Sequence, residues 1–195
     1  ALLHAKGFAG VNLTVPHKIQ ALTIAEALSP EARRAESVNT LVRTATGWTG
    51  HTTDGQGFLE ALRERTGRTT QGRPVILLGS GGAARAVAAA CLADGCASLH
   101  LHNRDVAKAT DLAAALADPR VRAAGLADIQ ASPEAVIVNC TTLGLKPTDA
   151  SPFPADLLAK GQFVFDTTYG TEPSRLLKDA RERGVAGCDG RSMLR

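Results

Sequence analysis

Lys18 and Asp54 are the two residues of this chain best suited to move a proton. Lys18 ends the polar cluster Asn12-Leu13-Thr14-Val15-Pro16-His17-Lys18, and Asp54 lies in a second cluster, Thr52-Thr53-Asp54-Gly55-Gln56-Gly57. Each cluster lies where an extended segment is expected to meet a helix, so its side chains can reach a cleft. A lysine and a carboxylate placed together supply a proton donor and a charge stabiliser. Taken alone, Lys18 is more often a surface residue at a helix start, and Asp54 a turn or cap residue.

A glycine-rich loop supplies the second chemical feature. The apolar run Val75-Ile76-Leu77-Leu78 leads directly into Gly79-Ser80-Gly81-Gly82-Ala83-Ala84, which opens an Ala-rich helical segment. The spacing Gly-x-Gly-x-x-Ala between a strand and a helix is typical of a dinucleotide-binding turn. The free amides and positive dipole end of the helix would face a pyrophosphate. A glycine turn that only reverses the chain is the alternative.

The next predicted strand indicates which dinucleotide is bound. An NAD site expects an acid at the end of this strand, but the chain has Asn103-Arg104, with Lys108 four residues further on. A guanidinium suits a 2′-phosphate, which an acid would repel. The sequence therefore favours NADP over NAD, although Arg104 and Lys108 also fit the solvated start of a helix.

The elements that must position these residues indicate an α/β fold in two parts. The polar break at residues 67–73 predicts a boundary between a domain of residues 1–70 and a domain of residues 71–195. Short apolar strands alternating with helices in the second part predict a parallel sheet covered on both faces. The predicted strands are 7–15, 38–44, 48–53, 74–79, 98–102, 135–140 and 163–166. The predicted helices are 18–28, one starting at 29–31, 57–66, 83–93, 106–117 and 172–183.

Composition excludes several classes of protein. The net charge is +3 with scattered basic residues, and aromatics make up 4% of the chain, so no nucleic-acid surface is expected. No apolar run is long enough to cross a membrane. His100 and His102 alternate on one strand without a third ligand nearby, so no metal site is expected. The four cysteines show no zinc-binding spacing and fit buried, reduced thiols of a cytoplasmic protein.

The motifs, taken in order along the chain, resemble the shikimate dehydrogenase family. The first cluster resembles the family's Asn-x-Thr-x-Pro-x-Lys motif, and the glycine loop and Asn103-Arg104 resemble its cofactor loop and NADP-phosphate clamp. The other matching segments are Ser37-Val38-Asn39-Thr40-Leu41, Thr53-Asp54-Gly55, Asn139-Cys140-Thr141-Thr142-Leu143-Gly144, Asp166-Thr167-Thr168-Tyr169 and Gly190-Arg191-Ser192-Met193-Leu194. The resemblance extends along essentially the whole chain.

This resemblance implies a fold, a reaction and a set of site residues. The first domain would be an α/β substrate domain and the second a Rossmann-type NADP-binding domain. The implied reaction is the NADPH-dependent reduction of 3-dehydroshikimate to shikimate, with Lys18 and Asp54 as the catalytic pair. Substrate would contact Asn12, Thr14, Asn39 and Tyr169; the cofactor would contact Gly79, Ser80, Gly81, Gly82, Ala83, Asn103, Arg104, Lys108, Thr141, Thr167 and Gly190.

Three departures from the family pattern keep alternatives open. Thr52 stands where the family usually has Asn, so the alternative interpretation is a paralogue that acts on quinate or an aminated analogue. The family's Ser-x-Ser motif is expected before residue 1 and its substrate-binding Gln after residue 195. We therefore expect a sequence clipped at both ends, with little activity on its own. A non-catalytic nucleotide sensor is the rival from another class, and either a monomer or a homodimer fits the residues.

Overall fold

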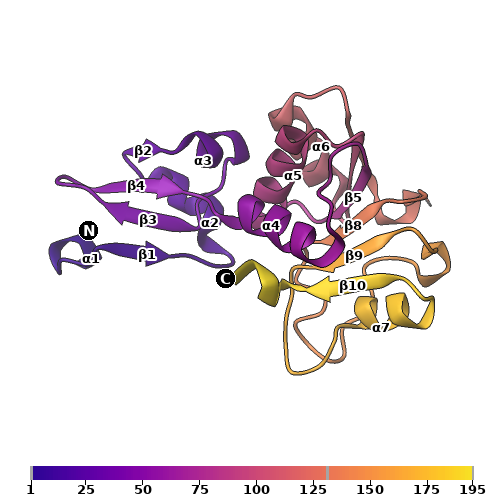
Figure 1. Cartoon of the computed structure of the whole chain (residues 1–195). Helices are drawn as coiled ribbons and strands as arrows, with labels where there is room; N and C mark the ends of the chain where they lie inside the picture. The colour runs from indigo at the N-terminus through magenta and orange to yellow at the C-terminus, as the bar shows by residue number, and fades with distance from the viewer. Residues whose placement is uncertain (1, 131, 195) are drawn as a thin grey trace.

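The computed structural model describes residues 2–130 and 132–194, and within them the chain forms two sheets (Figure 1). The smaller sheet has four strands in the order β1-β3-β4-β2, and the larger has six in the order β10-β9-β8-β5-β6-β7. All neighbouring strands of the larger sheet run parallel. The predicted α/β class with a parallel-sheet second part is thus confirmed.

The smaller sheet carries the first polar cluster and its partners. It consists of β1 (Gly10–Asn12), β2 (Ala27–Leu28), β3 (Thr40–Arg43) and β4 (Trp48–His51). The helices of this part are α1 (Leu2–Ala5), α2 (His17–Gln20) and α3 (Pro30–Ala35), with a 3-10 turn at Ala21–Thr23. As predicted, α3 begins at Ser29, whose hydroxyl accepts a hydrogen bond from the amide of Ala32 at 3.1 Å.

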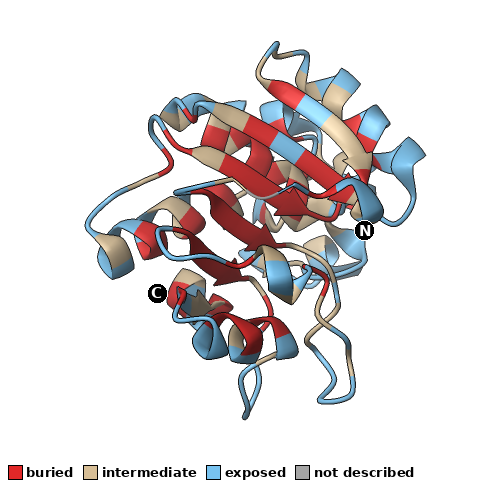
Figure 2. Ribbon diagram, turned by 90° about the vertical axis from the view of Figure 1, so that its right-hand side faces the viewer, coloured by how far each residue is buried: buried red, intermediate tan, exposed pale blue. Residues whose placement is uncertain are grey.

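The larger sheet alternates with helices as the sequence predicts. Its strands are β5 (Pro74–Leu78), β6 (Ser98–Asn103), β7 (Val121–Gly125), β8 (Val136–Asn139), β9 (Phe163–Asp166) and β10 (Ala186–Asp189). Its helices are α4 (Asp54–Thr66), α5 (Gly82–Asp94), α6 (Val106–Leu116) and α7 (Arg175–Glu182), and 3-10 turns lie at Leu126–Asp128, Ala155–Leu157 and Gly190–Leu194. The central strands β5, β8 and β9 are almost wholly buried (Figure 2). Burial on both faces explains their unbroken apolar runs.

Helix α4 joins the two parts. It precedes the boundary predicted at residues 70 and 71, yet Phe58 and Leu62 are fully buried in the core of the larger sheet, and Phe58 meets Phe165 of β9 edge to face at 4.9 Å. The helix ends at Gly67, whose φ of +69° is readily adopted only by glycine. The division into residues 1–70 and 71–195 stays a prediction.

The helix predicted over residues 18–28 is correct only as far as Thr23, and its second half is wrong. Helical structure ends by Thr23, and Ala27–Leu28 instead form β2, which pairs in parallel with Thr49 and Gly50 of β4. The amide of Glu26 donates to Trp48 O at 2.9 Å, so the backbone of this segment is bonded to the sheet. Pairing with β4 outweighs the helical pattern of the sequence, a common tertiary override of local propensity.

Several predicted boundaries shift, and besides β2 two strands of the larger sheet were not predicted. The strand expected at 7–15 pairs only over Gly10–Asn12, and the helix expected at 172–183 starts at Arg175 because Ser174 is its N-cap. The unpredicted strands β7 and β10 form the two edges of the larger sheet. Each is partly exposed and rich in small residues, so it lacks the apolar run that marks a central strand.

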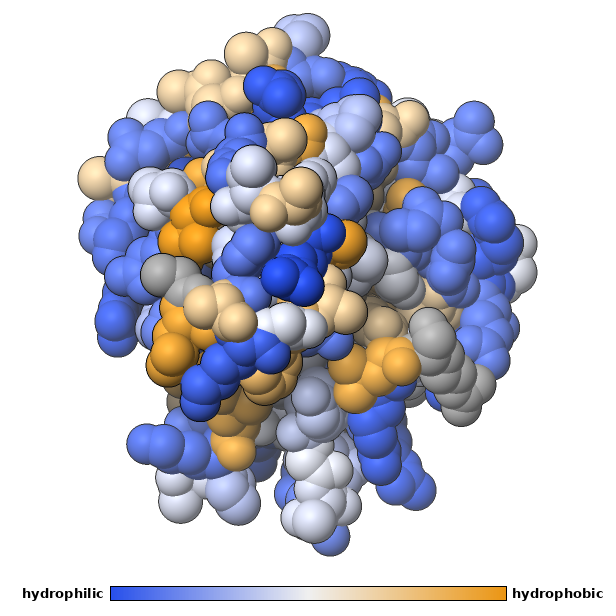
Figure 3. Space-filling model, turned by 90° about the vertical axis from the view of Figure 1, so that its left-hand side faces the viewer, coloured by the Kyte–Doolittle hydropathy of each residue, from blue (hydrophilic) through white to orange (hydrophobic). Residues whose placement is uncertain are grey.

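Exposed apolar side chains lie on the part of the molecule that carries the smaller sheet. They include Leu2, Phe8, Val15, Ile19, Ile24 and Val42. Figure 3 views this end and shows several apolar areas separated by hydrophilic ones. Across the residues that the structure describes, we find no helix that could cross a membrane.

The four cysteines are free thiols in protected positions. Burial raises the pKa of Cys91, Cys96 and Cys140, and raises that of Cys188 to about 12. Because the thiolate is the reactive form, we expect Ellman's reagent at pH 8 to modify fewer than about one thiol per folded chain within minutes. All four should react in denaturant. Rapid modification of two or more thiols in the folded protein would contradict this burial.

Candidate functional site

Lys18 and Asp54 form a close ion pair, as their chemistry predicts. Lys18 lies in the first turn of α2 and Asp54 is the first residue of α4. The ammonium Nζ donates to Asp54 Oδ2 at 2.6 Å, and only 13% and 12% of the two side chains are exposed. The partly dry setting strengthens the pair relative to one in water. It holds a proton donor and a carboxylate together at the junction of the two parts.

Asn39 holds the other oxygen of the same carboxylate. Its Nδ2 donates to Asp54 Oδ1 and to Thr53 Oγ1, each at 2.9 Å. Its Oδ1 accepts from the amide of Thr53 at 3.1 Å and from Thr40 Oγ1 at 2.9 Å. An amide side chain offers two donor hydrogens and two acceptor lone pairs, so all four positions are in use. Asn39, which the family resemblance places against substrate, orients Asp54 in this structure.

The other residues expected at the substrate side are more exposed. Asn12 on β1 lies beside the network, since its Oδ1 is 3.3 Å from Thr40 Oγ1. Thr14 is exposed in the turn that leads into α2, where its carbonyl accepts from the amide of His17 at 2.9 Å. Half of Tyr169 is exposed. Within the described residues, the side chains of Thr14 and Tyr169 have no hydrogen-bond partner, which leaves them free to contact a ligand.

The glycine loop has the geometry that the dinucleotide pattern predicts. Gly79 has φ +107°, and a Cβ there would lie 3.0 Å from Cys140 O. A Cβ at Gly81 would meet nothing within 4 Å, so the space above the loop is open. Ala84, the small third residue of the pattern, is fully buried. The loop opens α5, whose first amides have no partner within the helix, and this free donor end fits a pyrophosphate.

The end of β6 is tied to this loop, and two exposed basic residues follow it. Asn103 Nδ2 donates to Ser80 Oγ at 2.7 Å. Arg104 is exposed, with no ion pair in the part of the chain that the structure describes, and Lys108 forms only an exposed contact with Asp105 at 3.5 Å. A free guanidinium beside the predicted ribose position fits a 2′-phosphate. The donor set therefore fits the group that distinguishes NADP from NAD.

The carboxyl ends of β8 and β9 complete the same edge of the sheet. Strand β8 pairs in parallel with β5, and β9 pairs in parallel with β8, so Thr141, Thr167 and the glycine loop share one edge, where ligands bind in open α/β sheets. Thr141 Oγ1 donates to Asn139 Oδ1 at 2.7 Å, and the amide of Thr167 donates to Asn139 O at 2.9 Å. A Cβ at Gly190 would collide with Thr167 O, so this close approach requires glycine.

Two buried polar residues shape this edge, although their site roles were not predicted. Asn139 is fully buried, and its Nδ2 donates to Leu143 O at 2.8 Å and to Asp166 Oδ1 at 2.9 Å. Asp166 Oδ2 accepts from Ser174 Oγ at 2.5 Å, and burial raises the pKa of this carboxyl group. A polar residue that ends a buried apolar strand is the signal that could have identified both.

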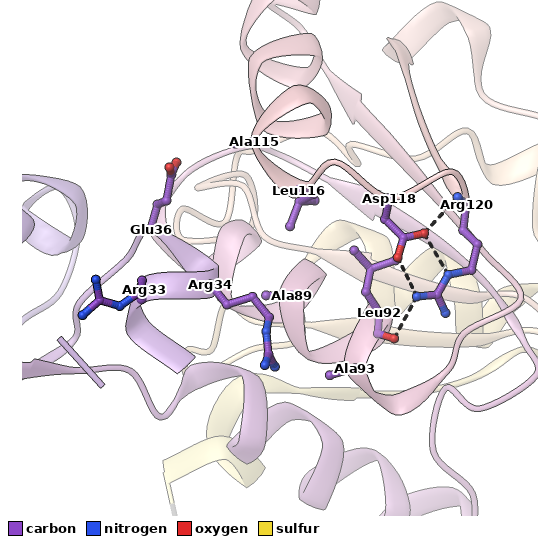
Figure 4. A pocket seen from close by; sticks show the side chains of 10 residues that line it. All are labelled: Arg33, Arg34, Glu36, Ala89, Leu92, Ala93, Ala115, Leu116, Asp118 and Arg120. Atoms are coloured by element: carbon purple, nitrogen blue, oxygen red, sulfur yellow. Dashed lines mark hydrogen bonds and ion pairs between the residues drawn. The ribbon is translucent and has the colours of Figure 1, made fainter. Parts of the chain in front are cut away.

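Two hollows lie away from these residues, in the junction between α3 and α5. One of about 660 Å³ is enclosed by α3, α5 and the end of α6 (Figure 4). Its lining is Arg33, Arg34, Glu36, Ala89, Leu92, Ala93, Ala115, Leu116, Asp118 and Arg120. The other, of about 370 Å³, lies between α3, α4 and α5. No residue predicted for the site lines either hollow, so the motifs and not the size of a cavity locate the site.

Among the described residues, no group of three or more His, Cys, Asp or Glu side chains is arranged to hold a metal ion. His102, one of the two histidines on β6, is buried and its Nδ1 lies 2.8 Å from Gly125 O.

Comparisons with known proteins agree with this geometry. Residues 1–41 match the family described as "Shikimate dehydrogenase substrate binding domain", and residues 61–146 match "Shikimate / quinate 5-dehydrogenase". The shikimate dehydrogenase (NADP(+)) of Moorella thermoacetica is 41% identical over 200 residues, covering 98% of this chain and 68% of its own length. That of Rhodospirillum rubrum is 44% identical, covering 100% and 71%.

Solved structures of shikimate and quinate dehydrogenases are also similar to this chain. The shikimate 5-dehydrogenase of Thermus thermophilus in complex with NADP(H) and shikimate has a TM-score of 0.85 and 36% identity, covering 99% of this chain and 70% of that one. The quinate dehydrogenase of Corynebacterium glutamicum in complex with NAD also has a TM-score of 0.85, with 30% identity, covering 99% and 71%. The two structures share the fold, but the first is in complex with NADP(H) and shikimate and the second is in complex with NAD.

Proposed function

The chain belongs to the shikimate dehydrogenase family, and from this membership we propose that it catalyses the reversible, NADP-dependent reduction of 3-dehydroshikimate to shikimate. The observation that carries the proposal is the 2.6 Å ion pair between Lys18 and Asp54 beside the opening of α5. The choice of substrate and cofactor is supported by the two relatives named shikimate dehydrogenase (NADP(+)) and by the Thermus thermophilus structure in complex with NADP(H) and shikimate.

In the proposed reaction, Lys18 supplies the proton and Asp54 keeps the lysine in place. When bound, the reduced nicotinamide supplies a hydride to the keto carbon of the substrate. Lys18 donates its proton to the carbonyl oxygen as negative charge develops there, so that the product is a neutral hydroxyl. Asp54, fixed by Asn39 on its second oxygen, orients the ammonium. In the reverse direction, neutral Lys18 accepts the hydroxyl proton.

Substrate recognition and cofactor recognition are proposed to fall on opposite sides of the junction. We propose that residues 1–70 bind substrate through Asn12, Thr14 and Asn39, with Tyr169 approaching from the other domain. Residues 71–195 would bind NADP: Gly79, Ser80, Gly81, Gly82 and Ala83 at the pyrophosphate, Asn103, Arg104 and Lys108 at the 2′-phosphate, and Thr141, Thr167 and Gly190 at the nicotinamide half. The family match of residues 1–41 supports the first assignment.

Quinate is the second candidate substrate. Thr52 stands where the family usually has Asn, and a relative in structure is a quinate dehydrogenase in complex with NAD. Arg104 and the absence of an acid at the end of β6 argue against NAD for this chain. We propose that shikimate with NADP is the preferred pair, and that the protein works in the cytoplasm as a monomer or a homodimer.

The test is a panel of substrates and cofactors on the full-length protein. Shikimate, quinate and an aminated analogue are each oxidised with NADP and with NAD, and absorbance of the reduced cofactor gives kcat/KM. Shikimate with NADP should give the highest value. A higher value for quinate with NAD would overturn the proposal in favour of the paralogue. Binding of NADP without turnover of any of the three would favour the nucleotide sensor.

A further inference from the structure

Gly82 is a glycine that the dinucleotide pattern does not require. It occupies one of the unspecified positions in Gly-x-Gly-x-x-Ala, whereas Gly79 and Gly81 occupy the two fixed ones. Its φ does not fall in the left-handed region, unlike that of Gly79. The contact proposed above between Gly82 and the pyrophosphate would be made by the backbone amide, which alanine also has. Neither the turn nor the approach of a pyrophosphate therefore explains why this position lacks a side chain.

The contacts of Gly82 explain why this position lacks a side chain. A Cβ at Gly82 would lie 2.5 Å from Lys18 Cβ, 3.0 Å from Ser37 Oγ and 3.2 Å from Lys18 Cδ. Lys18 Cβ is bonded directly to the backbone and cannot rotate away as the end of a flexible side chain would. The carbonyl of Lys18 also accepts from the amide of Val38 at 2.8 Å, which fixes its backbone. The stem of the lysine thus lies directly on the first turn of α5.

The same helix also holds the partner of Lys18. A Cβ at Gly55, the residue after Asp54, would lie 2.6 Å from Ala86 O and 2.7 Å from Ala90 Cβ on α5. A salt bridge of 2.6 Å between Arg85 of α5 and Glu36 fastens the segment before Ser37 to this helix. Two glycine contacts and one ion pair therefore bring both members of the catalytic pair onto α5.

We propose that Gly82 is a positioning residue for Lys18. Its missing side chain lets the stem of the lysine rest on the helix whose amino end faces the cofactor, so that the proton donor and the cofactor loop keep a fixed spacing. The proposal rests on the function proposed above, because it gives Lys18 the catalytic role. An added methyl group would move Lys18 away from the reacting atoms without touching the open space above Gly81.

The first test separates catalysis from cofactor binding. We expect Gly82→Ala to lower kcat by about 10- to 100-fold, since a small displacement of a catalytic group costs on this order, while the Kd for NADP changes by less than about threefold. The matched control Gly81→Ala should do the opposite, weakening NADP binding by about tenfold or more, because its Cβ would enter the open space of the loop. Equal losses of kcat and NADP affinity in Gly82→Ala would overturn the proposal.

The second test needs no turnover and identifies the atom that Gly82 avoids. Gly82→Ala should lower Tm by several degrees, on the order of 5 °C, as an overpacked contact does. The shift should persist in a Lys18→Ala background, which keeps Cβ, and shrink by half or more in a Lys18→Gly background, which removes it. If Gly82→Ala folds only with Lys18→Gly, the inference is supported. An equal shift in all backgrounds would overturn it, whereas a wild-type protein without shikimate turnover would overturn only the proposed function.

Discussion

Replacing Lys18 by methionine is expected to lower kcat for shikimate oxidation by about 10³-fold, with NADP affinity unchanged. A positioned general acid or base contributes roughly 10² to 10⁴ in rate, and methionine keeps the apolar stem but has no transferable proton. The stem matters because Lys18 lies against the first turn of α5. Steady-state kinetics with saturating NADP give kcat, and titration calorimetry gives the Kd for NADP.

Lys178→Met provides the matched control. Lys178 is exposed on α7, so the same change of residue type should leave kcat and Kd within about twofold of wild type. A Lys18→Met enzyme that retains a tenth or more of the wild-type kcat would remove Lys18 from the proton transfer. Loss of NADP binding together with activity would instead indicate that the substitution disturbs α5.

The pairing of Lys18 with Asp54 could be predicted from residue type and motif, but the hydrogen bonds that support the pair could not. The two polar clusters each lie where the sequence predicts that an extended segment meets a helix. In the structure, Lys18 Nζ and Asp54 Oδ2 are 2.6 Å apart. The role of Asn39 depends on which atoms its amide faces, and these belong to Thr53 and Asp54, fourteen and fifteen residues further along the chain. Hydrogen bonds between segments follow from tertiary packing, which local spacing does not encode.

The larger sheet was more predictable than the smaller one for a physical reason. Its central strands are buried on both faces, so their apolar runs mark them in the sequence. The edge strands β7 and β10 and the two-residue β2 owe their conformation to pairing with a neighbour rather than to their own composition. The segment 18–28 shows the consequence, because its helical pattern is overridden where Ala27 and Leu28 pair with β4.

Arg104→Ser is expected to raise the KM for NADP by about 30-fold and to leave the KM for NAD unchanged. A charge-assisted hydrogen bond contributes about 1.5 to 3 kcal/mol, which corresponds to roughly 10- to 100-fold in affinity. Arg104 is exposed without an ion-pair partner among the described residues, so its guanidinium is available to the 2′-phosphate that only NADP carries. The preference of the variant for NADP over NAD should therefore fall by the same factor.

The measurement is KM for each cofactor at saturating shikimate, repeated at low and high salt. Because the contact is electrostatic and exposed, the KM of the wild type for NADP should rise with ionic strength, and that of Arg104→Ser should rise less. Arg181→Ser, which removes an exposed arginine from α7, should change neither constant. If Arg104→Ser weakens NADP and NAD equally, the residue acts on the loop that both cofactors share, through Asn103 and Ser80, and the basis for NADP preference must lie elsewhere in the second domain.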